Sequence, residues 1–291
     1  MPSTKSIVSL AALAVAVQAS PLAARDTCDT ANDFTAAKCA NVGVIFARGT
    51  FDPGNIGPWV GCPFGDALHG AFGENVAFQG VDPSRYPADL SGYVDDGGSE
   101  TGASALASQV KAYATRCPKS KIVISGWSQG ALVAHKSFNY ITDKATRDRI
   151  IALAVFGDPI SVWSDTVSFP SIPSNTKFLP YCQTTTPDPL CANVSEDFPN
   201  TAGAFIDKLK AIWADVNQAE LNDGQRQALS SLMVQLPSQA SKKITKLGKD
   251  IIGGHLRRWL LTPEHFWYGV GDHPMTSQAA ADIFKVYQSS H

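Results

Sequence analysis

The chain has 291 residues, of which 44% are hydrophobic and 17% charged, a balance typical of globular proteins with a sizeable buried core. Lys and Arg total 24 against 26 Asp and Glu, which gives a formal net charge of −2 and argues against nucleic acid as a partner. No apolar run reaches the roughly 18 residues of a membrane span, so no transmembrane segment is predicted.

The first 19 residues have the pattern of a secretory signal peptide. Lys5 precedes an apolar run that ends at Val17-Gln18-Ala19, and this small-residue spacing is the one that signal peptidase accepts. We therefore expect a secreted, extracellular protein. Residues 20–38 are expected to form an N-terminal segment, with a possible pro-segment up to residue 25, and residues 39–291 a single domain.

Short, nearly continuous apolar runs alternate with helical patterns along the next part of the chain. Apolar runs of this kind predict strands buried on both faces, and amphipathic spacing predicts helices over Ser99–Arg116 and Ala131–Tyr140. Their alternation predicts an α/β fold, a three-layer sandwich around a central, mainly parallel sheet. The predicted strands are Val42–Ala47, Asn75–Val81, Lys121–Ser125, Ile150–Phe156 and Lys177–Tyr181.

The stretch from about residue 192 to 262 differs from the rest. It has helical periodicity over Ala204–Leu221 and Gln225–Leu236, and it has no strand pattern. We interpret it as a helical insertion within the single domain. A final helix is predicted from Ser277 to about Tyr287.

All six cysteines follow the predicted cleavage site. An even number in an exported chain favours three disulfides, and no Cys or His cluster has zinc-ligand spacing, so no metal site is predicted. The residues alone leave the pairing open. Asn193-Val194-Ser195 is a glycosylation sequon and indicates a surface loop if it is used.

The strongest chemical signal is Gly126-Trp127-Ser128-Gln129-Gly130, which follows an apolar strand and precedes a helix. This context is typical of a nucleophile elbow, in which a strained turn exposes the serine and side chains at the two glycine positions would collide. The turn also places the hydroxyl at the positive end of a helix. A serine needs a histidine to take its proton and an acid to orient that histidine.

An acyl-transfer site also needs donors for the oxyanion. The backbone N–H of Gln129, the residue after the nucleophile, is predicted as one donor. The loop Ala47-Arg48-Gly49-Thr50 follows an early strand, and Thr50 can offer both its N–H and its hydroxyl. The alternative is that Thr50 is a turn residue that satisfies its own backbone.

These motifs, taken with others, resemble the cutinase family of secreted serine esterases, which includes cutinases, acetylxylan esterases and cutinase-like lipases. The resemblance covers roughly residues 39–191 and 263–288 and implies an α/β-hydrolase-type fold. The further segments that carry it are Tyr86-Pro87-Ala88, the loop Cys182–Cys191 and His265-Phe266-Trp267-Tyr268-Gly269.

The resemblance decides between two candidates for the acid. Asp158 directly follows a predicted strand, whereas Asp188 lies inside the Cys182–Cys191 loop. The family carries its acid inside such a disulfide loop, which implies Asp188 and makes Asp158 a structural turn residue. A closed loop of this size restricts the chain and can fix a carboxylate.

The base is assigned in the same way. His265 begins a segment that looks like the family's His-x-x-Tyr-Gly, and His273 is the next candidate. We interpret His255, beside Arg257 and Arg258, as part of a solvated helix face.

The resemblance also implies disulfide partners. Cys39 and Cys117 match a family disulfide, and Cys182 and Cys191 close the acid loop. By this analogy Cys28 and Cys62 remain as the third pair.

The chain departs from the family between the acid and the base. Asp188 and His265 are 77 residues apart, whereas a short loop joins these residues in typical cutinases. The insertion is therefore either a lid, a wall of the cleft or a structural addition. Its aromatic residues and their neighbours either contact an acyl chain or pack the insertion onto the sheet, and we favour packing for Trp213, Trp259, Phe266 and Trp267.

We predict a secreted serine esterase that hydrolyses carboxylic esters, either a cutin-type polyester or short-to-medium acyl esters, through Ser128, His265 and Asp188. This chemistry needs no cofactor, and we expect a monomer. The alternatives are an acetylxylan or phospholipid esterase, or a catalytically silent secreted protein that keeps the fold.

Overall fold

The computed structural model describes residues 28–36, 38–192, 199–214, 216, 221–271 and 274–290. The predicted signal peptide and pro-segment, the sequon at Asn193 and the alternative base His273 lie outside the described residues.

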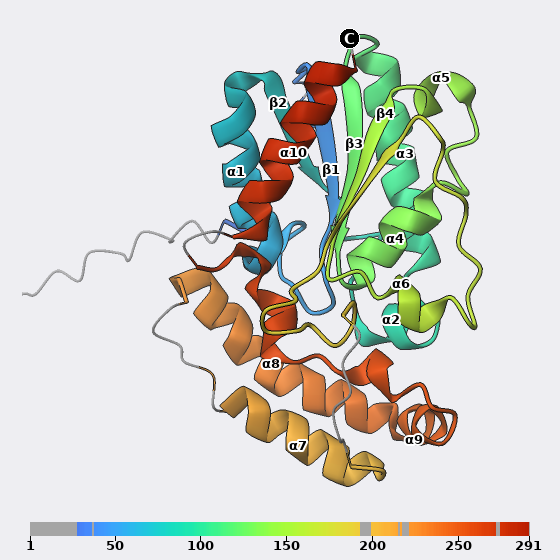
Figure 1. Ribbon diagram of the computed structural model, residues 1–291, viewed down its shortest axis with the longest axis vertical. Coiled ribbons are helices and arrows are strands. Elements are labelled where there is room, and N and C mark those ends of the chain that lie inside the picture. Colours follow the sequence, from blue (N-terminus) through green and yellow to red (C-terminus); the bar gives the residue numbers. More distant parts are fainter. Residues whose placement is uncertain are drawn as a thin grey trace, which may run out of the picture.

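Five parallel strands form one sheet in the order β2-β1-β3-β4-β5 (Figure 1). This confirms the predicted α/β class and the parallel sheet. Four strands are buried along nearly their whole length because helices cover both faces, but β5 lies at the edge and Phe178 is 38% exposed. The prediction of burial on both faces was wrong for β5. The strands are β1 Val42–Ala47, β2 Val76–Gly80, β3 Lys121–Trp127, β4 Ile150–Phe156 and β5 Lys177–Tyr181.

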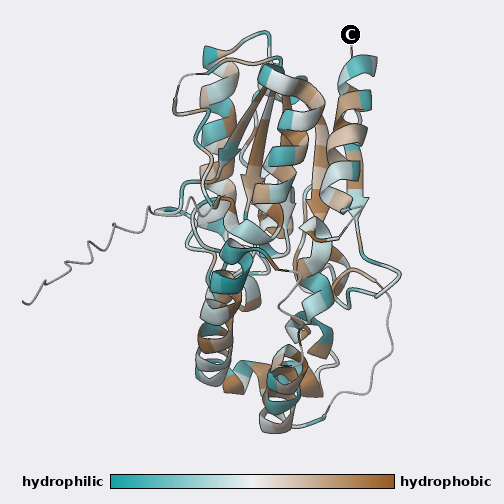
Figure 2. Cartoon of the chain, turned by 90° about the vertical axis from the view of Figure 1, so that its left-hand side faces the viewer, coloured by the Kyte–Doolittle hydropathy of each residue, from teal (hydrophilic) through white to brown (hydrophobic). Residues whose placement is uncertain are grey.

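Helices cover the two faces of the sheet and complete the three layers. The helices α1 (Cys62–Phe72) and α10 (Met275–Ser289) pack together on one face, and α3 (Glu100–Arg116) and α4 (Gln129–Ser137) on the other. Figure 2 shows the hydrophobic strands enclosed between these helices. Each face has its own apolar cluster, which explains why the strands read as continuous apolar runs.

Short elements connect the main ones at both ends of the sheet. Their sequences are too short for a helical period to stand out. They are η1 Gly57–Gly61, η2 Gly73–Asn75, α2 Leu90–Val94, α5 Lys144–Arg147, α6 Ile160–Trp163 and η5 Pro263–Gly269.

The insertion is helical, as predicted, with different boundaries. It contains α7 (Ala202–Ala214), α8 (Asp223–Lys242), α9 (Ile244–Ile252) and η4 (Leu256–Trp259). A capping box between Asn222 and Gln225 starts α8, and this helix runs past Pro237 instead of ending before it.

The insertion lies beyond the carboxyl ends of the strands (Figure 1), and α8 spans them. Near its start, Gln225 Nε2 donates to Pro58 O at 3.4 Å, and near its end Gln239 Oε1 accepts from Leu90 N at 3.2 Å. These bonds tie α8 to η1 on one side and to α2 on the other. Within the described residues, no helix is both long and apolar enough to traverse a bilayer.

Three disulfides join the pairs that the resemblance implies. They connect Cys28 to Cys62, Cys39 to Cys117 and Cys182 to Cys191. The first two tie the N-terminal segment to α1 and to the end of α3. The third closes the loop that follows β5.

Candidate active site

Ser128 occupies a strained turn between β3 and α4. Its φ of 59° and ψ of −124° lie in a region that side chains rarely adopt. A Cβ added at Gly126 would lie 2.2 Å from Gly130 O, and one added at Gly130 would lie 1.9 Å from Ala47 O. The glycines on both sides of the serine are thus a steric requirement, as the motif predicts.

Two groups beside Ser128 are suited to hold an oxyanion. Gln129 is the first residue of α4, so its N–H has no partner within the helix. The side-chain Nε2 of Gln129 donates to Thr50 Oγ1 at 2.9 Å and to Asp89 O at 2.8 Å. Thr50 is therefore bound to the elbow rather than to its own backbone, and its hydroxyl hydrogen is left to donate to another group.

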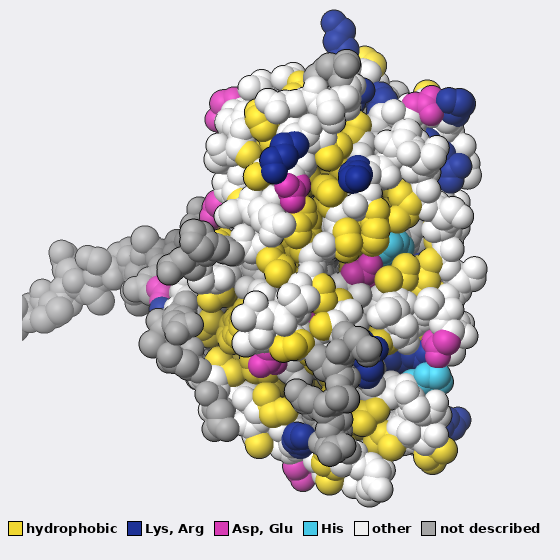
Figure 3. Space-filling view, viewed as in Figure 1, with side chains coloured by type: hydrophobic (Ala, Val, Ile, Leu, Met, Phe, Trp, Pro, Cys, Tyr) yellow, Lys and Arg dark blue, Asp and Glu magenta, His cyan; other side chains and the backbone are white. Residues whose placement is uncertain are grey.

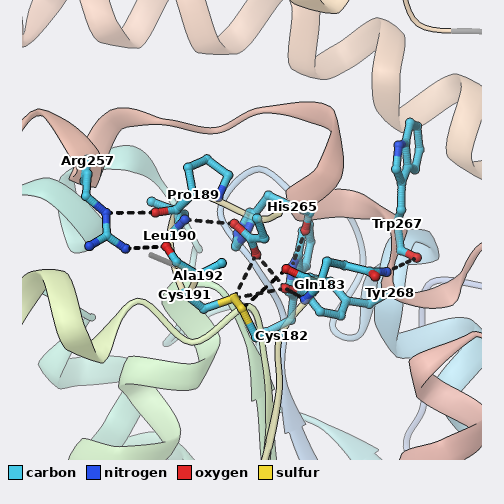
Figure 4. Close-up of polar contacts among 12 residues, drawn as sticks. Cys182, Gln183, Pro189, Leu190, Cys191, Ala192, Arg257, His265, Trp267 and Tyr268 are labelled. Carbon is cyan, nitrogen blue, oxygen red and sulfur yellow. Dashed lines mark hydrogen bonds and ion pairs between the residues drawn. A yellow bond between two sulfur atoms is a disulfide. The ribbon is translucent and has the colours of Figure 1, made fainter. Parts of the chain in front are cut away.

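The sheet and the loop after β5 bring Asp188 and His265 together. His265 Nδ1 lies 2.7 Å from Asp188 Oδ2, and neither side chain is exposed to solvent. Asp188 also accepts from Tyr268 OH at 2.5 Å and, through Oδ1, from Leu190 N at 2.9 Å (Figure 4).

These contacts set the protonation state of Asp188. Burial alone would raise the pKa of Asp188, but the charge of His265 and the hydrogen bonds from His265, Tyr268 and Leu190 hold the pKa below its ordinary value. Burial and the neighbouring carboxylate raise the pKa of Tyr268 well above its ordinary value. Tyr268 therefore stays a neutral donor and Asp188 a carboxylate.

The imidazole of His265 lies next to the residues that flank Ser128. The backbone carbonyl of His265 accepts from Trp127 Nε1 at 2.9 Å, and the centroids of the His265 and Trp127 rings are 5.5 Å apart. A Cβ added at Gly157 would lie 2.7 Å from His265 Cε1, while the preceding residue, Phe156, accepts the N–H of Ser128 at 3.0 Å.

The second nitrogen of the ring, His265 Nε2, is buried and has no hydrogen-bond partner among the described residues. The structure therefore contains no hydrogen bond from this nitrogen to Ser128 Oγ. Catalytic hydrogen bonds are often long in ligand-free enzymes and tighten when substrate binds.

The rival acid, Asp158, belongs to a different pair. Its Oδ2 lies 2.8 Å from His135 Nε2 on α4, and its Oδ1 accepts from Ile160 N at 3.1 Å. No hydrogen bond joins it to His265 within the described part of the chain. Asp158 thus closes the turn after β4, which agrees with its interpretation as a structural residue.

Arg257 of the insertion binds the loop that holds Asp188, closed by Cys182 and Cys191. This contact was not predicted from the sequence. Arg257 Nε donates to Pro189 O at 3.1 Å and its Nη2 to Ala192 O at 2.8 Å, on either side of Leu190 and Cys191 (Figure 4). The interpretation of this region as a solvated helix face was wrong. Its basic side chains reach inward to carbonyl and carboxylate oxygens.

Two neighbours of Arg257, Arg258 and His255, also bind oxygens of the domain. Arg258 is only 2% exposed and donates to Val162 O and Asp165 Oδ1. His255 Nδ1 lies 3.1 Å from Asp165 Oδ2. These bonds anchor the start of η4 to the segment around α6.

The site is buried, and the insertion packs against the residues beside it. Ser128 is 2% exposed and Thr50 is 4% exposed, so the serine is not exposed at the turn, contrary to the prediction from the motif. Phe266 packs edge to face on Trp213 of α7 at 4.8 Å and on Trp127 at 5.0 Å. Trp259 is buried as well, so Trp213, Trp259 and Phe266 pack the insertion onto the domain, as we expected. Trp267 is only partly buried, and its ring lies 5.8 Å from that of Trp59 on η1.

One group of side chains in the described residues has the spacing of metal ligands: Cys28, Cys62 and Asp66. The two sulfurs are joined in a disulfide and are not available as thiolate ligands.

Comparison with known proteins places the chain in a family. The Cutinase family matches residues 38–208, more than half of the chain. The chain belongs to the cutinase family. The matched segment contains Ser128 and Asp188 and ends inside α7, so His265 lies beyond it, on the far side of the insertion.

The relatives found by sequence are themselves named cutinases. The cutinase of Hypocrea jecorina (strain QM6a) is 40% identical over 131 residues, 45% of this chain and 49% of that protein. Cutinase 4 of Emericella nidulans is 37% identical over 166 residues, 56% of this chain and 66% of that protein. The chain thus spans about half to two thirds of the length of these relatives. A solved Trichoderma reesei cutinase in complex with a phosphonate inhibitor is 32% identical, covers 58% of this chain and 70% of its own, and has a TM-score of 0.46.

Proposed function

We propose that the protein is a secreted carboxylic ester hydrolase that uses Ser128, His265 and Asp188 as a catalytic triad. The observation that carries this proposal is the fully buried hydrogen bond between His265 Nδ1 and Asp188 Oδ2, 2.7 Å long, beside the strained elbow. Membership of the cutinase family supports an ester as the bond that is cleaved.

The reaction proceeds through an acyl-enzyme. Ser128 Oγ attacks the ester carbonyl while His265 Nε2 takes its proton, and Asp188 keeps the proton of Nδ1 in place and stabilises the imidazolium. The N–H of Gln129 and the hydroxyl of Thr50 donate to the oxyanion of the tetrahedral intermediate. His265 then gives the proton to the leaving alcohol, and water releases the acid by the same steps. No cofactor takes part.

Substrate binding requires the covering elements to rearrange. Ser128 and His265 are both almost inaccessible, and a carbonyl carbon must come within about 3–3.5 Å of the serine oxygen before it can react. Among the described residues, Gln225 binds α8 to η1, while Gln239 and an ion pair between Lys243 and Asp95 bind it to α2. Each of these polar contacts contributes only about 1 kcal/mol.

The substrate class follows from the relatives, and the compartment from the cysteines. We propose a cutin-type polyester or short-to-medium acyl esters as substrates, since the relatives that align with the chain are named cutinases. Three disulfides support an oxidising, extracellular compartment. We propose that the protein acts as a monomer.

Hydrolysis of p-nitrophenyl esters tests the proposal. The full chain should hydrolyse p-nitrophenyl butyrate, and Ser128→Ala should lower kcat by at least about 10⁴-fold. Ser125→Ala is the matched control, because Ser125 is also buried on β3 but its hydroxyl only donates to Ala154 O at 2.6 Å. Its kcat should stay near that of the unmodified chain.

Two results would count against the proposal. A folded chain that hydrolyses no ester in a panel of short and long p-nitrophenyl esters, cutin, acetylated xylan and phospholipid would be the catalytically silent alternative. Turnover that survives in Ser128→Ala would refute the nucleophile.

A further inference from the structure

The insertion exposes apolar side chains on α9. Ile244 is 45% exposed and Ile252 is 89% exposed. Eight residues are a little more than two helical turns, so both side chains project toward the same side of the helix. The opposite side is held by Leu247 and Asp250, which are buried. Ile244 and Ile252 form an apolar stripe that faces away from the protein and loses the stabilisation that burial would give, whereas Leu247 and the partly buried Ile251 pack inward.

The second half of the insertion, which contains α9, has an excess of positive charge, although the insertion as a whole, residues 192–262, holds nine Lys and Arg against seven Asp and Glu. Seven Lys and Arg residues lie between Gly224 and Thr262, against a single carboxylate, Asp250, which is buried and bonded to Trp259 Nε1 at 2.8 Å and to Lys246 at 3.1 Å. The stretch therefore exposes no carboxylate of its own.

Two lysines flank the apolar stripe. Lys242 and Lys249 are exposed. Lys249 lies three residues before Ile252 on α9, so the two side chains are neighbours on the helix surface, and Lys242 is the last residue of α8, two residues before Ile244. Neither forms an ion pair with any residue in the described ranges, whereas Lys243 pairs with Asp95. In Figure 3, hydrophobic and basic side chains adjoin at the lower right of the molecule, where Figure 1 places α9.

We propose that α9 docks the protein on an anionic lipid–water interface. A helix that presents apolar side chains flanked by free lysines fits a surface with an acyl interior and negatively charged headgroups. Because α9 follows α8 after a single residue and α8 lies beyond the carboxyl ends of the strands, where the elbow is (Figure 1), docking brings the end of the sheet that holds the site toward the lipid phase. This inference goes beyond ester hydrolysis, and it is tested without any catalysis.

Vesicle co-sedimentation of the full-length Ser128→Ala protein is the test. Ser128→Ala binds lipid without hydrolysing it, so a failure of the proposed ester chemistry does not affect the result. We expect binding to phosphatidylcholine–phosphatidylglycerol vesicles (7:3), at least about tenfold weaker binding to pure phosphatidylcholine, and weaker binding at 1 M NaCl because salt screens the lysines.

Substitutions assign the binding to α9. Ile244→Ser with Ile252→Ser should lower vesicle partitioning at least about tenfold, and Val234→Ser is its control because Val234 is 72% exposed on α8, outside the stripe. Lys242→Glu with Lys249→Glu should abolish the preference for anionic vesicles. Lys111→Glu with Lys119→Glu makes the same change of charge on and just after α3. This control should leave the preference for anionic vesicles unchanged.

Several results would overturn the inference. Equal binding by the α9 variants and the parent would exclude the surface, as would an equal loss in Val234→Ser or in the α3 control. Failure of the folded parent to bind anionic vesicles at low salt, with binding instead to a polyester film or a polysaccharide, would exclude a lipid partner. Circular dichroism and the melting temperature check that every variant is folded.

Discussion

Two buried aspartates, each paired with a histidine, allow activity and stability to be separated. Asp188 lies 2.7 Å from His265, and Asp158 lies 2.8 Å from His135. All four side chains are at most 6% exposed, but only the first pair adjoins the elbow. We predict that Asp188→Asn abolishes most activity, whereas Asp158→Asn mainly destabilises the fold.

The magnitudes follow from the bonds that each carboxylate makes. An asparagine at position 188 can present its NH₂ to His265 Nδ1, which favours the wrong tautomer, and kcat should fall about 10⁴-fold, or about 5 kcal/mol of barrier. At position 158 the amide oxygen can still accept from Ile160 N, so the change only replaces the charge-assisted bond to His135 with a weaker bond between neutral groups. That replacement should cost about 1–3 kcal/mol of unfolding free energy, a fall in Tm of about 2–4 °C for each kcal/mol.

Acid pH provides a second readout of Asp188. Its pKa is lowered in the folded protein, so its carboxylate stabilises the fold above the ordinary Asp pKa, and that stabilisation is lost as the pH falls through the lowered value. The Tm difference between the unmodified chain and Asp188→Asn should therefore shrink as the pH is lowered through the acid range.

The assays are initial rates on p-nitrophenyl butyrate and thermal unfolding of both variants. Asp158→Asn should keep kcat within about threefold. A large loss of kcat in Asp158→Asn together with normal turnover in Asp188→Asn would reverse the assignment and refute the reasoning from the disulfide loop.

Three further substitutions probe the surroundings of the triad. Thr50→Val keeps the shape but removes the hydroxyl, so kcat should fall about 10²–10³-fold with KM nearly unchanged; an unchanged kcat would show that Thr50 does not hold the oxyanion. Arg257→Ala frees two carbonyls of the acid loop and should lower kcat about tenfold, with partial recovery in Arg257→Lys; equal Tm and kcat in all three proteins would contradict the positioning role. Gly157→Ala places a Cβ 2.7 Å from His265 Cε1 and should lower kcat by more than about tenfold in a folded protein, so full activity would place the reactive ring elsewhere.

Sequence alone was sufficient for the parts of the fold that depend on local patterns. The runs that became β1, β4 and β5 have the predicted boundaries because they are short, apolar and bounded by turns. The Gly-x-Ser-x-Gly motif predicted a strained turn because its geometry excludes side chains on both sides, and the φ of Ser128 agrees. The placement of Asp188 depended on family resemblance, since Asp158 satisfies the local pattern equally well.

The parts that could not be predicted depend on long-range contacts. Arg257 reaches a loop 68 residues earlier in the chain, and no local pattern encodes this pairing. The helix α9 was missed because its apolar residues do not form a single buried face: Ile244 and Ile252 are exposed, while Leu247 and the polar Asp250 are buried. The helix α8 continues through Pro237, a residue that usually ends a helix, because both ends of α8 are held by tertiary contacts with η1 and α2.

Mass-spectrometric mapping of a fluorophosphonate adduct tests the central claim most directly, because this reagent modifies a serine that has been activated as a nucleophile. We expect a single adduct on Ser128 in the unmodified chain and a rate of labelling reduced by at least about 10³-fold in His265→Ala. An unlabelled Ser128 in the folded protein, or labelling that proceeds as fast without the His265 imidazole, would contradict that claim.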